Sequence, residues 1–141
     1  MARWSGSSRN SQPWRFLVVR DVELMRRIAD IGDPQTRSLR TAMAAFAITL
    51  PDERSQSISL AYDDGRVAER VLVGAAMLGL GAGITWVRDD VRQQIGGLLG
   101  VGEGRFVRTI MALGHPTEQA LAPKAAPGEA RLPLDDLVRF D

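Results

Sequence analysis

The feature that most constrains the fold of this sequence is an uninterrupted apolar run within a predicted helix. We expect this helix over about residues 65–80, with Asp63 or Asp64 as its cap and Glu69 in its first turns. From Val71 onward its residues are apolar on every side, and a helix of that kind must be covered all round. Two interpretations stay open: a second subunit covers part of the helix, or the chain's own sheet covers it entirely.

Length and composition indicate one globular domain. The 141 residues suffice for a core that buries about two thirds of the surface of the unfolded chain. A hydrophobic content of 45% with 25% charged residues is typical of soluble proteins, and no apolar run reaches the roughly 18 uncharged residues of a spanning helix. The first nine residues contain no apolar signal segment. We therefore expect a single domain over residues 1–141, no membrane partner and a cytoplasmic location.

Residue usage excludes several kinds of chemistry. The chain has no cysteine and one histidine, which excludes disulfides, thiolate nucleophiles and most metal sites. Its net charge of +1 argues against a nucleic-acid partner, because the phosphate backbone requires a strongly basic face. The first 40 residues nevertheless carry eight arginines against four acidic residues, an excess of four. These arginines either lie solvated on helix faces or favour an anionic small ligand.

Apolar periodicity predicts strands and helices in alternation. Strands are expected over residues 15–20, 43–50, 84–87 and 105–113, and further helices over residues 21–31, capped by Asp21, and 89–99, capped by Asp89 and Asp90. A helical turn is expected over residues 35–40, a loop over 52–64, and an extended surface segment over 116–133. This order favours a two-layer or three-layer arrangement of helices and a mixed sheet, and we expect an α+β fold (α/β/α-like) in which helices flank a central mixed β-sheet. The C-terminal arm, about residues 117–141, has an apolar tip that we expect to dock on a neighbouring subunit.

A polar loop leads directly into the first predicted strand. It reads Ser7-Ser8-Arg9-Asn10-Ser11-Gln12-Pro13-Trp14, and the apolar residues of the strand follow at once. Small hydroxyl and amide side chains at the start of a buried strand are typical of a ligand-binding loop. The sequence therefore predicts a cofactor loop at this position.

The glycine-rich stretches have different roles. Gly79-Leu80-Gly81-Ala82-Gly83 closes a helix and opens a strand, whereas phosphate-binding glycine loops follow a strand and open a helix. Gly79 or Gly81 is therefore expected as a helix C-cap, and Gly83 leaves its backbone open to a flat ligand. The glycines of residues 100–104 and the single His115 are expected in turns, and no nucleophilic triad or catalytic side chain is predicted.

The order of these motifs resembles the FMN-dependent nitroreductase family. The matching residues are Ser7-Ser8-x-Asn10-x-Gln12-Pro13-Trp14 before a Phe-x-Val-Val strand, Gly79-Leu80-Gly81-Ala82-Gly83 with Trp86 after it, Ala112-Leu113-Gly114-x-Pro116 at the end of a strand, and Arg131-x-Pro133-Leu134. The resemblance covers nearly the whole chain in the order of the family. Family members carry a longer, Arg-rich N-terminal region before the loop, whereas six residues precede Ser7 here, so we expect an N-terminally shortened member.

The resemblance implies a homodimer with two FMN sites at its interface and a C-terminal arm that embraces the partner. By position, Ser7 and Ser8 would bind the ribityl chain or the phosphate of FMN. Asn10 would address the flavin ring, and Gln12 would support the loop. Arg131 would reach the phosphate.

The resemblance also implies roles for the second half of the site. Ala82 and Gly83 would present backbone groups near the flavin N5. Arg37 or Arg40 is a candidate for the positive charge near N1. A reduced flavin requires fixed donors and positive charge at these positions.

The implied function is transfer of hydride from NAD(P)H through FMN to a flat acceptor such as a nitroaromatic or a quinone. No side chain need act as acid or base. The alternative is a shortened, non-catalytic flavin-binding or structural dimer of the same fold. The flavin-consuming branch that makes the lower ligand of cobalamin shares the Gln-Pro-Trp loop, but no residue of this chain favours it.

Overall fold

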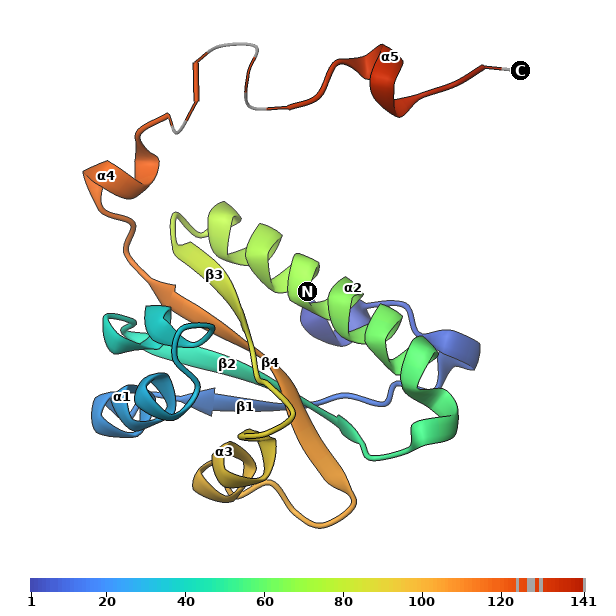
Figure 1. Cartoon of the computed structure of the whole chain (residues 1–141), viewed down its shortest axis with the longest axis vertical. Coiled ribbons are helices and arrows are strands. Elements are labelled where there is room, and N and C mark those ends of the chain that lie inside the picture. The colour runs from blue at the N-terminus through green and yellow to red at the C-terminus, as the bar shows by residue number, and fades with distance from the viewer. Residues whose placement is uncertain (124, 127–128, 130, 141) are drawn as a thin grey trace.

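The computed structural model describes residues 1–123, 125–126, 129 and 131–140. One four-stranded sheet in the order β1-β2-β4-β3 lies at its centre (Figure 1), built from β1 (Arg15–Val19), β2 (Ala44–Pro51), β3 (Gly81–Trp86) and β4 (Arg105–Gly114). All three strand pairs are antiparallel, so the mixed sheet that we predicted is not found within the described residues. The strands β1 and β3 form its two edges.

Helices cover both faces of this sheet, which confirms the predicted α+β layers. The main helices are α1 (Val22–Ile31), α2 (Ser57–Met77) and α3 (Arg92–Leu98). The helices α1 and α3 pack on one face around a core that contains Ile110, and α2 packs on the other face over a core that contains Met111. These neighbours on β4 serve opposite cores because successive side chains of a strand point to opposite faces.

The elements with strong local signals agree with the sequence prediction. The strands β1, β2 and β4 lie within one residue of the predicted bounds. The helix α1 begins after Asp21, whose carboxylate accepts a hydrogen bond from the backbone N–H of Leu24 at 3.0 Å. Gly79 has a φ of 70°, in agreement with its predicted place after the helix end.

The largest correction concerns α2. It begins at Ser57, after a 3₁₀ turn η4 (Arg54–Gln56), within the stretch that we had predicted as a loop. Asp63 and Asp64 are therefore not caps; they lie inside the helix and are 2% and 5% exposed. Both carboxylates accept a hydrogen bond from a group distant in sequence, so the local pattern could not assign them.

The C-terminal end of α2 is not covered by the sheet of its own chain. Val73, Met77 and Leu78 are 42%, 76% and 77% exposed. The interpretation that the sheet covers this apolar run entirely is therefore wrong. Coverage by a second subunit stays a prediction.

Two smaller corrections follow from ion pairs and from strand pairing. The helix α3 starts at Arg92 without a side-chain cap, and Asp89 and Asp90 instead form ion pairs with Arg92 and Arg88. The strand β3 starts at Gly81 rather than at Ile84, because all three preceding residues pair with β4.

The remaining elements are short. They are the 3₁₀ turns η1 (Ala2–Trp4), η2 (Ser8–Asn10) and η3 (Arg37–Arg40), and the helices α4 (Glu118–Leu121) and α5 (Leu134–Leu137). The helix α4 corrects the prediction of a wholly extended segment, of which residues 124, 127, 128 and 130 lie outside the described part.

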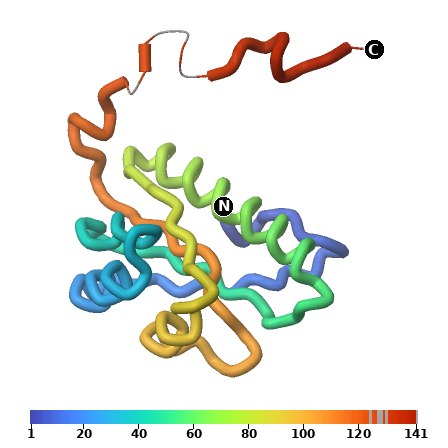
Figure 2. The backbone as a smooth tube through the Cα atoms, viewed as in Figure 1, coloured from blue at the N-terminus to red at the C-terminus, as the bar shows by residue number. Residues whose placement is uncertain are grey.

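The two ends of the chain take different paths. The N-terminal segment lies against α2, and the described part of the C-terminal arm extends away from the sheet beyond the end of β4 (Figure 2). Within the described residues, no helix combines the length and apolar character needed to cross a membrane.

Candidate functional site

The polar loop of residues 7–12, called the 7–12 loop below, is closed by its own hydrogen bonds. The backbone N–H of Gln12 donates to the hydroxyl of Ser7 at 2.9 Å, and the side-chain amide of Gln12 donates to Oδ1 of Asn10 at 3.3 Å. Arg9, Asn10 and Gln12 all have positive φ, at 52°, 55° and 48°. Non-glycine residues seldom adopt this conformation, and such residues cluster at ligand sites. The loop therefore presents hydroxyl and amide groups in one fixed conformation, in which its backbone dihedral angles are energetically unfavourable.

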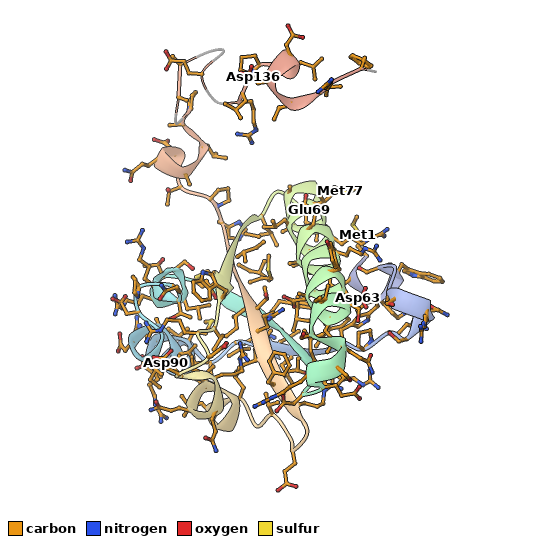
Figure 3. The ribbon with its side chains drawn as sticks, turned by 45° about the vertical axis from the view of Figure 1, so that its right-hand side comes forward. Met1, Asp63, Glu69, Met77, Asp90 and Asp136 are labelled. Atoms are coloured by element: carbon orange, nitrogen blue, oxygen red, sulfur yellow. The ribbon has the colours of Figure 1, made fainter. Side chains whose placement is uncertain are left out.

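Two anchors hold the 7–12 loop on the body of the protein. On one side, both carboxylate oxygens of the buried Asp63 accept the backbone N–H of Ser8 at 3.1 Å. On the other side, Pro13 and Trp14 are buried, and the Trp14 ring stacks on Phe16 with centroids 6.4 Å apart. The loop thus lies beside α2, next to Asp63 (Figure 3), and leads into β1.

A second candidate region lies at the free edge of β3. A cavity of about 340 Å³ is lined there by Gly81, Ala82 and Gly83, by the facing end of β4 and by Ser38. A Cβ added at Gly83 would meet no atom within 4 Å, whereas one at Gly81 would lie 3.3 Å from Pro116. Gly83 therefore leaves open space over its backbone, as the sequence predicted.

An adjoining hollow of about 470 Å³ distinguishes the two candidate arginines. It is lined by Arg37, Ser38, Ile84, Pro34 and Gln35. The Arg37 guanidinium has no hydrogen bond or ion pair within the part of the chain that the structure describes. Arg40 instead pairs with Asp30 at 2.9 Å and with Asp33 at 3.3 Å. Arg37 is therefore the arginine that can meet a ligand at β3.

Arg88 binds the segment that borders this hollow. Its guanidinium donates to the backbone oxygen of Asp33 at 2.7 Å and to the carboxylate of Asp90 at 3.0 Å. The hydrogen bond from Arg88 lowers the pKa of the Asp90 carboxyl. Arg88 thus holds the segment before η3 in place, and Arg37 remains available.

Asp64 lies on the face of α2 that packs against the sheet. The hydroxyl of Thr109 on β4 donates to its Oδ2 at 2.6 Å, and its buried Oδ1 has no partner among the described residues. Burial raises the pKa of Asp64, while the hydrogen bond from Thr109 and the positive charge of Arg108 act in the opposite direction.

The predicted site residues form two groups that one chain does not bring together. The 7–12 loop carries Ser7, Ser8, Asn10 and Gln12, and β3 carries Ala82 and Gly83; Figures 1 and 3 show these regions on opposite sides of α2. Along the helix, Asp63 and Met77 are about 21 Å apart at 1.5 Å per residue. Arg131 belongs to the C-terminal arm, which extends away from both groups.

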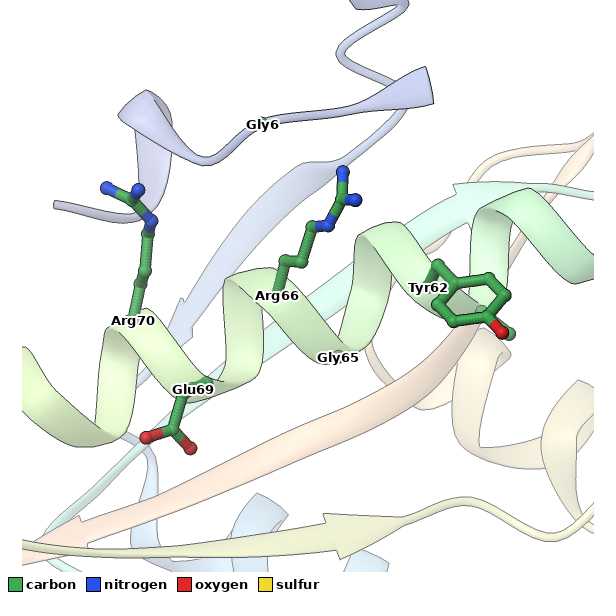
Figure 4. A pocket seen from close by; sticks show the side chains of 7 residues that line it. Gly6, Tyr62, Gly65, Arg66, Glu69 and Arg70 are labelled. Atoms are coloured by element: carbon green, nitrogen blue, oxygen red, sulfur yellow. The ribbon is translucent and has the colours of Figure 1, made fainter. Parts of the chain in front are cut away.

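A further hollow coincides with neither group. It measures about 730 Å³ and lies along the outer face of α2, where Tyr62, Gly65, Glu69 and Arg70 line it (Figure 4). No group of three or more histidine or acidic side chains suited to a metal occurs within the described residues.

Asp63 is the residue near the site that the sequence analysis misassigned. Leu60, Asp63, Asp64 and Val67 recur at spacings of three and four, the period of one buried helix face. That spacing was the available signal, and it indicates a helix that begins before residue 60.

The chain resembles known nitroreductases in sequence and in fold. No protein-family model matches the chain. A curated protein of Archaeoglobus fulgidus named "Putative NADH dehydrogenase/NAD(P)H nitroreductase" is 28% identical over 119 residues, which cover 80% of this chain and 67% of that protein.

Solved structures give the same fold. The FMN-dependent nitroreductase of Clostridium difficile superimposes with a TM-score of 0.82 at 24% identity and covers 99% of this chain and 82% of its own. Nitroreductase A of Vibrio parahaemolyticus gives a TM-score of 0.78 at 23% identity and covers 99% of this chain and 63% of its own. The predicted resemblance to the nitroreductase family is confirmed.

Proposed function

Because the chain has the nitroreductase fold and resembles an NAD(P)H nitroreductase in sequence, we propose that it is an FMN-dependent oxidoreductase. It passes hydride from NAD(P)H to a flat acceptor such as a nitroaromatic or a quinone. The observation that carries the proposal is the pair of adjoining hollows at β3. Ser38 lines both hollows, Arg37 lines one of them, and the open backbone of Gly83 lines the other.

The β3 half of the site fits the ring of a flavin. A flat ring requires a floor without side chains, and Gly83 offers one at the sheet edge. A reduced ring carries negative charge, and Arg37 is the cation of the neighbouring hollow without a partner in the described part of the chain. Arg37 therefore takes the role near N1, in preference to Arg40.

The 7–12 loop fits the polar tail of the same cofactor. The Ser7 hydroxyl already accepts from Gln12, so its own hydrogen remains available to donate to a phosphate or ribityl oxygen. Ser8 and Asn10 are exposed beside it. Gln12 holds Asn10 and Ser7 through its two hydrogen bonds, and this supports a role for Gln12 in maintaining the loop.

We propose that the complete site forms between two copies of the chain. The loop and the β3 edge lie on opposite sides of α2, so one cofactor reaches both groups if they come from different subunits. The uncovered apolar residues Val73, Met77 and Leu78 support a second copy on this helix. Arg131, on the C-terminal arm, would add positive charge for the phosphate from the partner.

The contribution of the chain to the reaction is binding and orientation. FMN, when bound, supplies the hydride chemistry, so the site needs no acid or base side chain. Ser38, Ile84 and the β3 backbone bound the space in which nicotinamide and acceptor would alternate. Holding two flat molecules in contact and away from water accelerates such a transfer.

Titration with FMN tests this proposal. Purified chain mixed with FMN should quench flavin fluorescence, and the complex should oxidise NADH or NADPH when a quinone or a nitroaromatic is added. Arg37→Gln should weaken FMN binding by about tenfold, the effect of losing one charge-assisted contact. Arg40→Gln on the same turn is the matched control and should retain the wild-type affinity, because Arg40 already pairs with Asp30 and Asp33.

Two results would contradict the proposal. A colourless dimer that takes up no FMN would overturn the oxidoreductase proposal and favour the non-catalytic dimer. Equal losses of FMN affinity in Arg37→Gln and Arg40→Gln would show that the flavin does not bind at the β3 hollow.

A further inference from the structure

We propose that Asp63 is the positioning residue that fixes the 7–12 loop in its binding shape. Its carboxylate is 2% exposed and accepts the backbone N–H of Ser8 with both oxygens at 3.1 Å. Asp63 would not touch the cofactor; it acts through Ser8. The inference rests on the proposed function only where it concerns flavin affinity, because the shape of the loop can be measured without flavin.

The hydrogen bonds of the loop show why this anchor matters. Within the described residues, the other hydrogen bonds of residues 7–12 stay inside the loop or reach the neighbouring Arg15. The bond from Ser8 to Asp63 is therefore the tie that joins the loop to α2, across 55 positions of sequence. Removing it leaves the described residues of the loop without a hydrogen bond to α2.

The loop also needs a tie because its backbone is in an unfavourable conformation. The positive φ values of Arg9, Asn10 and Gln12 persist only where the surrounding structure holds them. A charged acceptor makes a stronger hydrogen bond than a neutral one. The buried carboxylate of Asp63 thus stabilises a loop shape that the free segment would seldom adopt.

Arg66 forms an ion pair with the buried carboxylate of Asp63. Its guanidinium lies 3.7 Å from the Asp63 carboxylate, one turn further along α2. The same guanidinium lies 3.7 Å from the position that a Cβ of Gly6 would occupy, so Arg66 crosses the segment just before the loop. Figure 4 shows Arg66 pointing from α2 toward this segment.

Asp64 offers a matched comparison on the same helix. It is the same residue type, is equally buried, and binds Thr109 on β4 rather than the loop. Replacing either aspartate by asparagine exchanges one buried carboxyl oxygen of α2 for an amide nitrogen at nearly constant size. An effect on the loop that appears in one variant alone therefore reports the tie to Ser8 and not the general cost of the substitution.

The first test measures cleavage after Arg9 by trypsin, followed by mass spectrometry on the full chain without FMN. Arg9 is exposed at the centre of the loop. Asp63→Asn leaves one neutral amide oxygen as acceptor, so it should raise the rate of this cleavage by about tenfold, the factor for losing the charge that strengthens the hydrogen bond. Asp64→Asn should cleave there at the wild-type rate. Equal rates in the two variants would overturn the inference.

The second test removes the donor instead of weakening the acceptor and covers a failure of Asp63→Asn to fold. Ser8 is the first residue of η2 and follows Ser7, whose ψ of 159° is extended, so a proline suits its position. Ser8→Pro removes the N–H and should raise cleavage after Arg9 at least as much as Asp63→Asn does, and the double variant should cleave no faster than Ser8→Pro. Ser8→Ala retains the N–H and should cleave at the wild-type rate. Additive effects of the two substitutions, or fast cleavage of Ser8→Ala, would overturn the inference.

The third test links the loop to the proposed cofactor. Asp63→Asn should weaken FMN binding by about tenfold, whereas Asp64→Asn should not. Wild-type chain that takes up no FMN would count against the proposed function, and the cleavage comparison would then decide on Asp63 by itself. Wild-type flavin affinity in a loosened Asp63→Asn loop would show that the loop does not contact FMN.

Discussion

Trp14→Ala should lower the free energy of unfolding by about 3–5 kcal/mol, the usual cost of removing a buried aromatic ring. Trp14 is 5% exposed and packs in the core beneath α2 with Ile48 and Met111. A buried indole removes on the order of 150–250 Å² from water, which at about 25 cal/mol per Å² corresponds to about 4–6 kcal/mol. The lower figure is expected because the unfolded chain already buries part of its apolar surface.

Urea unfolding followed by circular dichroism measures this loss. The protein concentration is held constant, because a dimer would make the apparent stability depend on it. The matched control is Trp4→Ala: Trp4 is 74% exposed, so its removal should change the free energy of unfolding by less than about 0.5 kcal/mol. A loss below about 1 kcal/mol in Trp14→Ala, at an unchanged dependence on urea, would refute the buried anchor after the 7–12 loop.

Two further predictions concern the sheet side of α2 and the β3 hollow. Burial raises the pKa of Asp64 above the ordinary 3.8, so its contribution to stability is present below that pH and is lost as pH rises through the folded pKa. The stability of Asp64→Asn relative to wild type should therefore increase from acidic to neutral pH in urea titrations, and a difference independent of pH would contradict the raised pKa. Gly83→Val should retain the wild-type free energy of unfolding within about 0.5 kcal/mol, because its Cβ meets no atom within 4 Å, yet should weaken FMN binding by at least about tenfold in fluorescence titrations. Wild-type affinity in this variant would place the flavin elsewhere.

The sequence predicted those elements whose signals are local. The strand β1 follows Pro13, and α1 begins where Asp21 can accept from a backbone N–H three residues later. Period and cap are both properties of neighbouring residues. The bounds of β1, β2, β4 and α1 could therefore be derived without knowledge of the fold.

The sequence misled where a partner is distant. Asp63 and Asp64 looked like caps because a pair of acidic residues before an apolar run is a typical helix start. Their actual partners are Ser8 and Thr109, 55 and 45 positions away. For the same reason, the sequence could not distinguish Arg37 from Arg40 as the arginine near the flavin. The structure distinguishes them, because Arg40 is already paired with Asp30 and Asp33.

The helix α2 connects these findings into one physical argument. One of its buried carboxylates holds the 7–12 loop, and the next residue holds β4 through Thr109, so a single rigid element fixes the loop relative to the sheet. Its far end leads into β3 and leaves Met77 and Leu78 exposed close to Gly81 in sequence. A subunit that covered this end would therefore also cover the edge where Gly83 and Arg37 lie. Assembly and closure of the proposed flavin site would then be one event, which explains why neither half of the site is enclosed within one chain.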